Sequence, residues 1–325
     1  MSNQIEKAYI NSFKAGFEQA FQQTQSKMRP YVEIERQAAE FDFYDRVGLA
    51  DPMQEVTARY GANPINEVPH DRRRIGLRDW DWGKPIDEKD LIRVATDPTS
   101  AYMQAAVASA NRRVDDIIIP SLTATAYTGK SGETQVNFVS TTAAKITVGA
   151  ISNTENRIAT AGDYILTAGN YEGIDVGQSI GAATSGLNLA KLKAMRTTMQ
   201  KIEGIDQDTL LNCFITAHQA NELLGIDEII NSDYSVRKNL AEGGVTTFMN
   251  YRFIQTERLL KTSTNREVMV TLPKAAKLAI GLDIKADMWR LTGNKNIPYI
   301  YIKLCMGATR MWGEVCGRIN CLENA

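Results

Sequence analysis

The stretch that decides the fold is residues 97–120, which read Asp-Pro-Thr-Ser-Ala-Tyr-Met-Gln-Ala-Ala-Val-Ala-Ser-Ala-Asn-Arg-Arg-Val-Asp-Asp-Ile-Ile-Ile-Pro. Asp97 is a good N-cap, and Pro98 suits the first helical position. No helix breaker interrupts the run from Ala101 to Ile119, so the stretch predicts one helix of roughly 30 Å that ends before Pro120. Small side chains leave a smooth stripe along which a sheet or another helix can approach closely: Ala101, Ala105 and Ala108.

Upstream of this helix, two alternating runs predict a long β-hairpin within residues 52–85. The first run is 54–60, turn residues follow it, and the second run is 72–82. Neither face of the second run is apolar enough for a core, and tryptophans beside clustered arginines are typical of protein interfaces. A solvated surface hairpin is one interpretation. We favour a hairpin that lies on another chain, because an isolated two-stranded hairpin is barely stable alone.

The N-terminal segment 1–29 has an apolar residue at every fourth position from Ile5 to Phe21. This spacing predicts a helical stripe, which belongs either to a surface helix on its own core or to an arm on a neighbouring subunit. The side chains that we expect at a subunit contact come from this stripe and from the hairpin: Phe13, Phe17, Phe21, Arg72, Arg73, Arg74, Arg78, Asp79, Trp80 and Trp82.

Downstream of the long helix, residues 121–186 are rich in Gly, Ser, Thr and Ala and predict irregular β structure. A helix is expected over about 187–203. Residues 206–289 look like a separate α/β unit, with strands at 210–216, 251–256 and 267–272 and helices at 218–224 and 234–241. The last stretch predicts two strands, 299–305 and 309–320, which join near Gly307 and return to the first body.

Length and composition exclude several classes of protein. A chain of 325 residues exceeds the roughly 250–300 at which one core stops growing, so we expect two compact bodies plus extensions. The net charge is −1, from 37 basic and 38 acidic side chains, so the protein does not hold nucleic acid by bulk charge. No apolar run approaches the length of a membrane span, and the N-terminus is not of the signal-peptide kind.

Cysteines and histidines give no metal or disulfide pattern. Four cysteines in a chain this long are not a disulfide framework, and we interpret them as reduced thiols of an intracellular product. Cys316 and Cys321 are five positions apart, so in a strand they face opposite sides. Two histidines rule out a three-histidine zinc site. Asp283 and Asp287 would share a face of a helix, but no further ligand stands near them. We therefore expect no metal and no cofactor.

Two short motifs resemble catalytic ones but lack the required context. Residues 124–131 end in Gly-Lys-Ser around Lys130, as a phosphate-binding loop does, but the sequel is β-like instead of helical. Residues 177–181 match G-x-S-x-G around Ser179, but the following helix begins several residues too late for a nucleophile elbow. His218 is the only histidine downstream, and a lone histidine is more often a packing or capping residue than a base. We expect no catalytic residues.

The order of the parts and several short motifs resemble one known family. The motifs are Ser26-Lys27-Met28-Arg29, Arg72-Arg73, Asp79-Trp80, Ile86-Asp87-Glu88, Asp90, Asp97-Pro98, Tyr102, Ala110, Arg113, Asp116, Thr128-Gly129, Gly307-Ala308-Thr309-Arg310, Cys321 and Glu323. In this order they resemble the major capsid protein of tailed bacteriophages, which has the Hong Kong ninety-seven type fold. The resemblance covers almost the whole chain.

The resemblance implies an α+β capsid fold and a role for each segment. These are an N-terminal arm at 1–51, an extended hairpin loop at 52–85, a peripheral domain at 86–205 with a spine helix at 98–119, an inserted axial α/β domain at 206–289, and strands at 290–325 that return to the peripheral domain. It implies a non-enzymatic subunit that self-assembles as hexamers and pentamers into an icosahedral head. The head confines double-stranded DNA with little sequence reading.

The implied partners are copies of the same chain, a portal, a scaffold and decoration proteins, with no membrane. The implied location is the virion shell, after synthesis in the host bacterial cytoplasm. Two alternatives remain at this point: an encapsulin-like cellular compartment with the same fold, and a nucleotide-binding or hydrolytic enzyme that uses Lys130 or Ser179.

Overall fold

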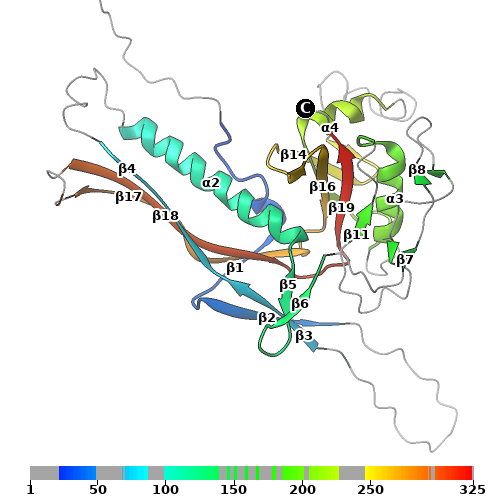
Figure 1. Cartoon of the computed structure of the whole chain (residues 1–325), viewed down its shortest axis with the longest axis horizontal. Helices are drawn as coiled ribbons and strands as arrows, with labels where there is room; N and C mark the ends of the chain where they lie inside the picture. The colour runs from blue at the N-terminus through cyan, green and yellow to red at the C-terminus, as the bar shows by residue number, and fades with distance from the viewer. Residues whose placement is uncertain are drawn as a thin grey trace, which may run out of the picture. The chain divides into compact units, whose positions relative to one another are not determined.

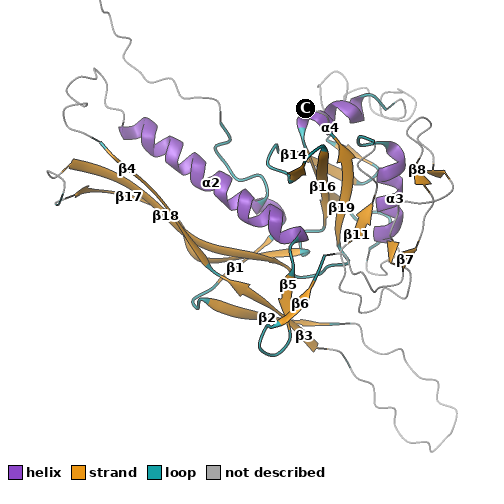
Figure 2. Ribbon diagram, in the orientation of Figure 1, coloured by secondary structure: helices purple, strands orange, loops and turns teal. Residues whose placement is uncertain are grey.

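The structure is a computed structural model with an α+β architecture (Figures 1 and 2). It describes residues 22–48, 68, 70–86, 99–138, 145–146, 150–151, 158–159, 166–167, 178–180, 185–200, 205–226, 246–291, 293 and 297–323. Several expectations lie outside the described residues, namely the aromatic stripe with Phe13, Phe17 and Phe21, the run 54–60, the N-cap Asp97 and the helix at 234–241.

The chain divides into two compact units, and it passes between them several times. One unit consists of Met1–Ser26, Arg78–Val114 and Gly281–Met306. The other consists of Lys27–Leu77, Asp115–Ile280 and Gly307–Ala325. Neither unit is a continuous piece of sequence, so each depends on contacts between segments that are distant along the chain.

The long helix is confirmed as α2 (Thr99–Thr123), but the predicted end before Pro120 is wrong. The helix continues for one more turn because its apolar face stays buried there, at Ile118, Ile119 and Leu122. A proline costs a helix one backbone donor, and burial of these side chains offsets that loss. The backbone N–H of Ala124 donates to the carbonyl of Pro120 at 2.8 Å and closes the last turn.

A four-stranded sheet has the order β1 (Glu33–Arg36), β17 (Ala276–Leu291), β18 (Ile297–Arg310) and β4 (Arg78–Pro85). The predicted break near Gly307 is wrong, because β18 runs straight through it. A Cβ atom at Gly307 would overlap the carbonyl oxygen of Gly76, so this glycine serves a close approach between backbones instead of a turn. Asp283 and Asp287 lie in strand β17, not on a helix.

A second four-stranded sheet has the order β2 (Phe41–Val47), β3 (His70–Gly76), β5 (Ala126–Thr128) and β6 (Thr134–Val136). The run 72–82 is not one strand: β3 pairs with β2, and the run divides at Leu77, while its expected partner 54–60 lies outside the described residues. The second part of the run is β4, which pairs with β18 in the other sheet. Alternation of side chains continues smoothly across such a change of partner, so the sequence pattern did not reveal it.

The largest sheet has seven strands, in the order β11, β19, β16, β12, β14, β13, with β15 beside β16. Its strands are β11 (Gln178–Ile180), β12 (Leu211–Ile215), β13 (Thr247–Phe248), β14 (Tyr251–Gln255), β15 (Lys261–Thr262), β16 (Asn265–Thr271) and β19 (Cys316–Leu322). The expected strand at 309–320 is therefore misplaced. The chain turns after β18, and β19 lies between β11 and β16, where Ile319 and Cys321 are fully buried in the core of the sheet.

Two helices accompany this sheet, α3 (Leu189–Gln200) and α4 (Ala217–Leu224), and both were expected from the sequence. α3 buries Leu192, Met195 and Met199 in the core of the sheet. A Cβ atom at Gly317 would press against the Met195 sulfur, so this glycine allows the helix to lie close to β19. α4 begins with a capping box between Thr216 and Gln219 and is closed by Gly225.

Four very short strands complete the described structure. β7 (Lys145–Ile146) pairs with β10 (Leu166–Thr167), and β8 (Ala150–Ile151) pairs with β9 (Ile158–Ala159). They fall in the region for which irregular β structure was expected. Among the described residues, no helix has the length and apolar character needed to cross a membrane.

Candidate functional site

The β2–β3 pair carries partly exposed arginines that pack against aromatic rings. The Arg72 Nε atom lies 3.1 Å from Oδ1 of Asp45, and its guanidinium lies 5.6 Å from the centre of the Phe43 ring. Arg74 lies 4.9 Å from the centre of the Phe41 ring and 5.1 Å from that of Tyr127. Cation–π contacts of this kind hold a guanidinium in place at a surface without removing it from water. Arg72 and Arg74 therefore remain available to a neighbouring molecule.

Arg73 points to the opposite side and is fully buried, so it offers no surface to a neighbour. Burial lowers its pKa to about 9, and the nearby charge of Arg46 acts in the same direction. Arg46 itself donates from Nε to Asp71 Oδ2 at 3.1 Å and from Nη1 to the Met311 carbonyl at 2.6 Å. Arg73 was expected at a subunit contact, but its side chain is instead buried inside its own chain.

Asp71 is the acidic partner in this internal cluster. Burial alone would raise the pKa of its carboxyl, but hydrogen bonds from Thr128 and Arg46 outweigh that effect and lower the pKa to about 2. The Thr128 hydroxyl oxygen also lies 2.8 Å from the Arg72 carbonyl oxygen. The cluster therefore fixes β5 to the β3 backbone through charged hydrogen bonds, which are about twice as strong as neutral ones.

Arg310 joins the end of α2 to the sheet below it. Its Nη1 atom donates to the carbonyls of Leu122 at 3.0 Å and Ala124 at 2.9 Å, and Nη2 donates to Val136 at 3.2 Å. Its guanidinium also lies 5.2 Å from the centre of the Phe138 ring. The last carbonyls of a helix attract positive charge, so this buried arginine caps α2. The sequence had marked Arg310 only as part of a motif.

Trp80 and Trp82 do not share a strand face with Arg74, because β3 and β4 belong to different sheets. The register places Trp80 opposite Leu304 and Trp82 opposite Ile302, and both of these partners are buried. Residues that lie directly opposite in a sheet share a face. The tryptophans are therefore half-buried beside core residues. Arg78 and Asp79, at the start of β4, are exposed.

The opposite face of the same sheet carries a cluster of aromatic rings that the sequence did not predict. The Trp289 ring lies 5.6 Å from the Tyr299 ring and 5.0 Å from the Tyr301 ring. A Cβ atom at Gly83 would overlap the Tyr299 hydroxyl, so the glycine leaves room for that ring. A hydrogen bond with Asp81 raises the pKa of Tyr301. Trp289 is 43% exposed, so this cluster is open to a partner.

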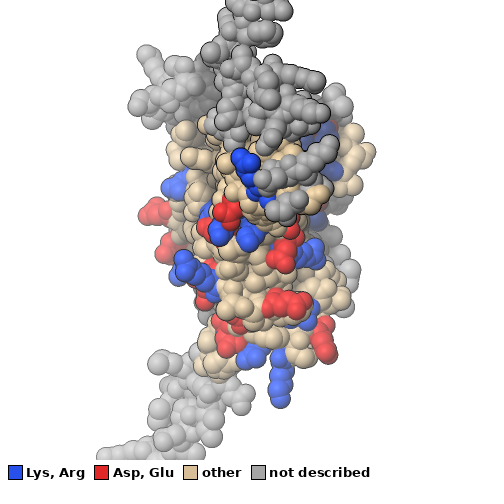
Figure 3. All heavy atoms as spheres, turned by 90° about the vertical axis from the view of Figure 1, so that its left-hand side faces the viewer, with Lys and Arg blue, Asp and Glu red and all other residues tan. Residues whose placement is uncertain are grey.

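Charges of both signs are interspersed on the face shown in Figure 3, and neither sign forms a continuous patch among the described residues in view. A surface that grips a nucleic acid backbone would be strongly basic. The pattern on this face fits contacts between proteins, in which paired charges set the register.

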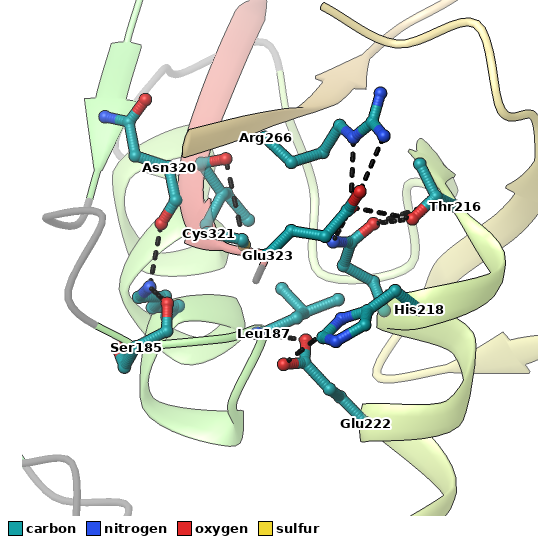
Figure 4. A network of polar contacts seen from close by, with 12 residues as sticks. Ser185, Leu187, Thr216, His218, Glu222, Arg266, Asn320, Cys321 and Glu323 are labelled. Carbon is teal, nitrogen blue, oxygen red and sulfur yellow. Dashed lines mark hydrogen bonds and ion pairs between the residues drawn. The ribbon is translucent and has the colours of Figure 1, made fainter. Parts of the chain in front are cut away.

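A buried polar network holds the C-terminal strand (Figure 4). Arg266 donates to Glu323 from Nη2 at 2.6 Å and from Nε at 3.0 Å, and Gln219 donates to the same carboxyl at 2.9 Å. The hydrogen bond from Arg266 is the main reason why the pKa of Glu323 lies far below its usual range. Because Gln219 also caps α4, the network joins the last described residue to that helix.

The residues considered for catalysis are not assembled into an active site. Lys130 lies in the turn of the β5–β6 hairpin, where no helix follows. Ser179 lies inside strand β11, opposite Arg318 of β19. His218 is half-exposed, with Nδ1 at 3.6 Å from Glu222 Oε1 on the next turn of α4.

The described residues contain no group of three metal-ligating side chains, and all four cysteines are free thiols. Burial raises the pKa of the Cys316 and Cys321 thiols to about 12, which makes them poor nucleophiles. Cys316 and Cys321 are both buried in β19, but only Cys321 belongs to the core cluster that contains Ile319, as expected for positions five apart in a strand.

Comparison with known proteins identifies the family. The family model described as phage capsid protein matches residues 5–323. The chain belongs to the phage capsid protein family. It is therefore a structural protein of a capsid and not an enzyme. No curated protein matches the chain by sequence.

Solved capsid structures have the same fold over the full length. The capsid of cyanophage P-SCSP1u is similar with a TM-score of 0.67 and 13% identity, over 100% of this chain and 96% of that one. The structure from Mycobacterium phage Che8 is similar with a TM-score of 0.66 and 12% sequence identity, over 96% of this chain and 97% of that one. The capsid of a native GTA particle is similar with a TM-score of 0.63 and 12% sequence identity, over 97% of this chain and 96% of that one. The fold is thus the Hong Kong ninety-seven type fold of phage major capsid proteins.

Proposed function

We propose that copies of this chain assemble as hexamers and pentamers into the icosahedral head of a tailed bacteriophage, which encloses double-stranded DNA. The observation that supports this most strongly is the family match over residues 5–323, combined with a capsid fold that covers both ends of the chain. The exposed aromatic rings and arginines described above suit a subunit that is partnered on several sides.

In this proposal each segment has a role in the shell. Residues 1–51 form the arm, and α2 is the spine helix of the peripheral domain. The hairpin loop includes the segment that joins β2 to β3, and it reaches a neighbouring subunit. The seven-stranded sheet with α3 and α4 forms the axial domain, which meets its copies at the centre of each hexamer or pentamer.

The shell confines DNA without reading its sequence. The net charge of −1 supports this, since tight packing of like subunits is easier when they carry little charge. The further partners in this proposal are a portal, a scaffold and decoration proteins. The protein is made in the host bacterial cytoplasm and then resides in the virion shell.

Electron microscopy of the purified protein, combined with its mass in solution, tests the proposal. We expect closed shells, tubes, hexamers or pentamers. Deletion of residues 62–69 should weaken assembly, and a control that replaces them with a Gly/Ser segment of the same length separates loss of reach from loss of side chains. A stable monomer, even with the neighbouring phage proteins added, would overturn the proposal. Shells that carry a cargo enzyme in place of DNA would indicate an encapsulin-like compartment instead.

A further inference from the structure

One face of the sheet made of β2, β3, β5 and β6 is open and carries arginines among aromatic rings. The register sets Arg74 opposite Phe43 of β2 and opposite Tyr127 of β5, so these side chains share a face. Phe41 and Arg72 belong to the same face by alternation along their strands. The residues of the opposite face are buried: Tyr44, Arg73, Ile75 and Ala126. We call the open side the arginine face.

Arg74 is held on the arginine face without a carboxylate partner. Its guanidinium lies 4.9 Å from the centre of the Phe41 ring and 5.1 Å from that of Tyr127. Arg72 pairs with Asp45 at 3.1 Å, whereas Arg74 forms no ion pair with any residue that the structure describes. The two rings therefore orient the Arg74 guanidinium and leave its donors to another group.

A face of opposite charge surrounds the aromatic cluster on the sheet that contains β4, β17 and β18. Tyr301 contacts the Trp289 ring and is hydrogen-bonded to Asp81. The register places Asp81 opposite Lys303, two positions after Tyr301, and Asp79 follows on the same face. Within the described chain, neither aspartate forms an ion pair, with Lys303 or with another cation. We call this side, with Trp289, Tyr301, Asp79 and Asp81, the aspartate face.

The exposed aromatic rings belong to these two faces. Among the described residues three aromatic side chains are exposed, and they are Phe41, Tyr127 and Trp289. Two of them lie on the arginine face, and the third lies on the aspartate face. Aromatic rings are enriched at contacts between proteins, where complementary charges beside them set the register. An arginine without an acidic partner and two carboxylates without a cationic partner match in charge and in hydrogen bonding.

Contact between two like faces is unfavourable. Two arginine faces would bring Arg74 of one copy toward Arg74 of the other, and two aspartate faces would bring four carboxylates together. Like charges across a contact are repulsive and exclude that arrangement. Contact between unlike faces joins opposite charges instead. Such a contact is heterologous, and its repetition closes into a ring when the rotation between copies allows it.

Strand β1 also presents carboxylates, but it is a poorer match for Arg74. The Lys277 ammonium already lies 2.5 Å from Glu35 and 3.9 Å from Glu33. The exposed apolar side chain of this strand is Ile34, which is not aromatic. The aspartate face has both features that β1 lacks, namely carboxylates without a cation and an exposed ring.

We propose that the arginine face of one copy docks on the aspartate face of a second copy, with the Arg74 guanidinium directed at Asp79 and Asp81. This inference names one contact of the proposed shell and rests on the proposed self-assembly. The occupant is a second copy because one chain carries both complementary faces. The contact would cover the three aromatic side chains that the described chain leaves exposed.

Charge reversal tests the contact. Arg74→Glu and Asp81→Lys should each weaken association of the purified full chain about tenfold in sedimentation, because each sets like charges against each other. The double variant restores opposite charges with the signs exchanged, so it should associate within about threefold of the parent. Arg36→Glu is the matched control, since it makes the same change in net charge at an exposed arginine outside both faces. A double variant as weak as the single ones, or a control as weak as Arg74→Glu, overturns the proposal.

Crosslinking separates contact between unlike faces from contact between like faces, and it leaves the proposed charge pair intact. Gln135 lies opposite Tyr127 on the arginine face, and Lys303 lies opposite Asp81 on the aspartate face. In a Cys305→Ser background, a mixture of Gln135→Cys and Lys303→Cys chains should give dimers of the two variants with a short bismaleimide. Each variant alone should give none, because the other three cysteines are buried. Dimers from one variant alone, or none from the mixture, overturn the docking.

The same experiments distinguish this contact from the capsid function. Shells that form without the crosslink, and equally well from both charge-reversed variants, remove the contact and leave the capsid function standing. A parent chain that stays monomeric with the neighbouring phage proteins added overturns both.

Discussion

Strand β12 and the outer half of β17 are both parts of large sheets, yet they have opposite surroundings. Every residue of β12 is buried, and β14 and β16 pair with it on its two sides. From residue 281 to 291, β17 has no buried residue and one paired side within the described chain. One strand is completed by its own chain, whereas the other presents its apolar side chains to solvent.

This difference separates the sources of stability and of association. Burial of apolar area drives folding, so changes in β12 should act on the free energy of unfolding of the single chain. Changes in the outer half of β17 should act on contacts between copies. The following predictions test that separation.

The largest effect on stability is expected from Phe214→Ala in β12. The Phe214 ring is fully buried and meets the Tyr31 ring edge-on, with centroids 5.8 Å apart. The change should lower the free energy of unfolding by about 3–5 kcal/mol, measured by denaturant titration. A loss below about 1 kcal/mol would mean that this sheet does not carry the stability of the chain.

A smaller loss is expected from Glu323→Ala, which leaves Arg266 without its carboxylate partner. The side chains of this pair are only 12% and 10% exposed, so the loss should be about 3 kcal/mol. Glu35→Ala is the matched control, because Glu35 pairs with Lys277 at 2.5 Å but is 47% exposed. That control should lose no more than about 1 kcal/mol. Equal losses from the two changes would contradict the importance of burial here.

The parts of the fold that could be predicted from sequence are those with local signals. α2 follows from its uninterrupted run of helix-compatible residues, α3 follows from the spacing of its apolar residues, and the end of α4 follows from Gly225. The family resemblance also depended on motifs whose order is local to the chain. Such signals need no knowledge of which strand lies beside which.

The parts that could not be predicted depend on distant partners. The alternation of 72–82 continues through Leu77, although the strands before and after it belong to different sheets. Glycine is typical of turns, but Gly307 instead lets its own backbone approach the backbone of Gly76 closely. The aromatic cluster was missed because β17 contains glycine, aspartate and lysine, which are depleted in strands, so the position of Trp289 beside Tyr299 was not visible.

Acid should remove a further, smaller contribution, which comes from Asp71. Its pKa of about 2 in the folded chain lies below the ordinary value of 3.8, so the folded state binds the proton less tightly. The stabilisation is present above about pH 5 and is lost as the pH falls through 2. Because this carboxyl is 37% exposed, we expect only about 1 kcal/mol. The difference in unfolding free energy between the parent and Asp71→Asn, measured from pH 5 to pH 2, should shrink by that amount. A constant difference would contradict the role of Asp71.

The smallest effect on stability is expected from Trp289→Ala. This change is the sharpest test of the comparison between the buried strand β12 and the exposed outer half of β17. Trp289 is partly exposed and contacts Tyr299 and Tyr301, so its loss should cost the single chain about 0.5–1 kcal/mol. If the open sheet is completed by other copies, the same change should reduce assembly far more than it reduces stability, because large aromatic side chains dominate contacts between proteins. Denaturant titration and particle yield, measured on the same preparation, separate the two effects. Parallel small losses in both would mean that the exposed ring is only a surface feature of a sheet that the chain completes by itself.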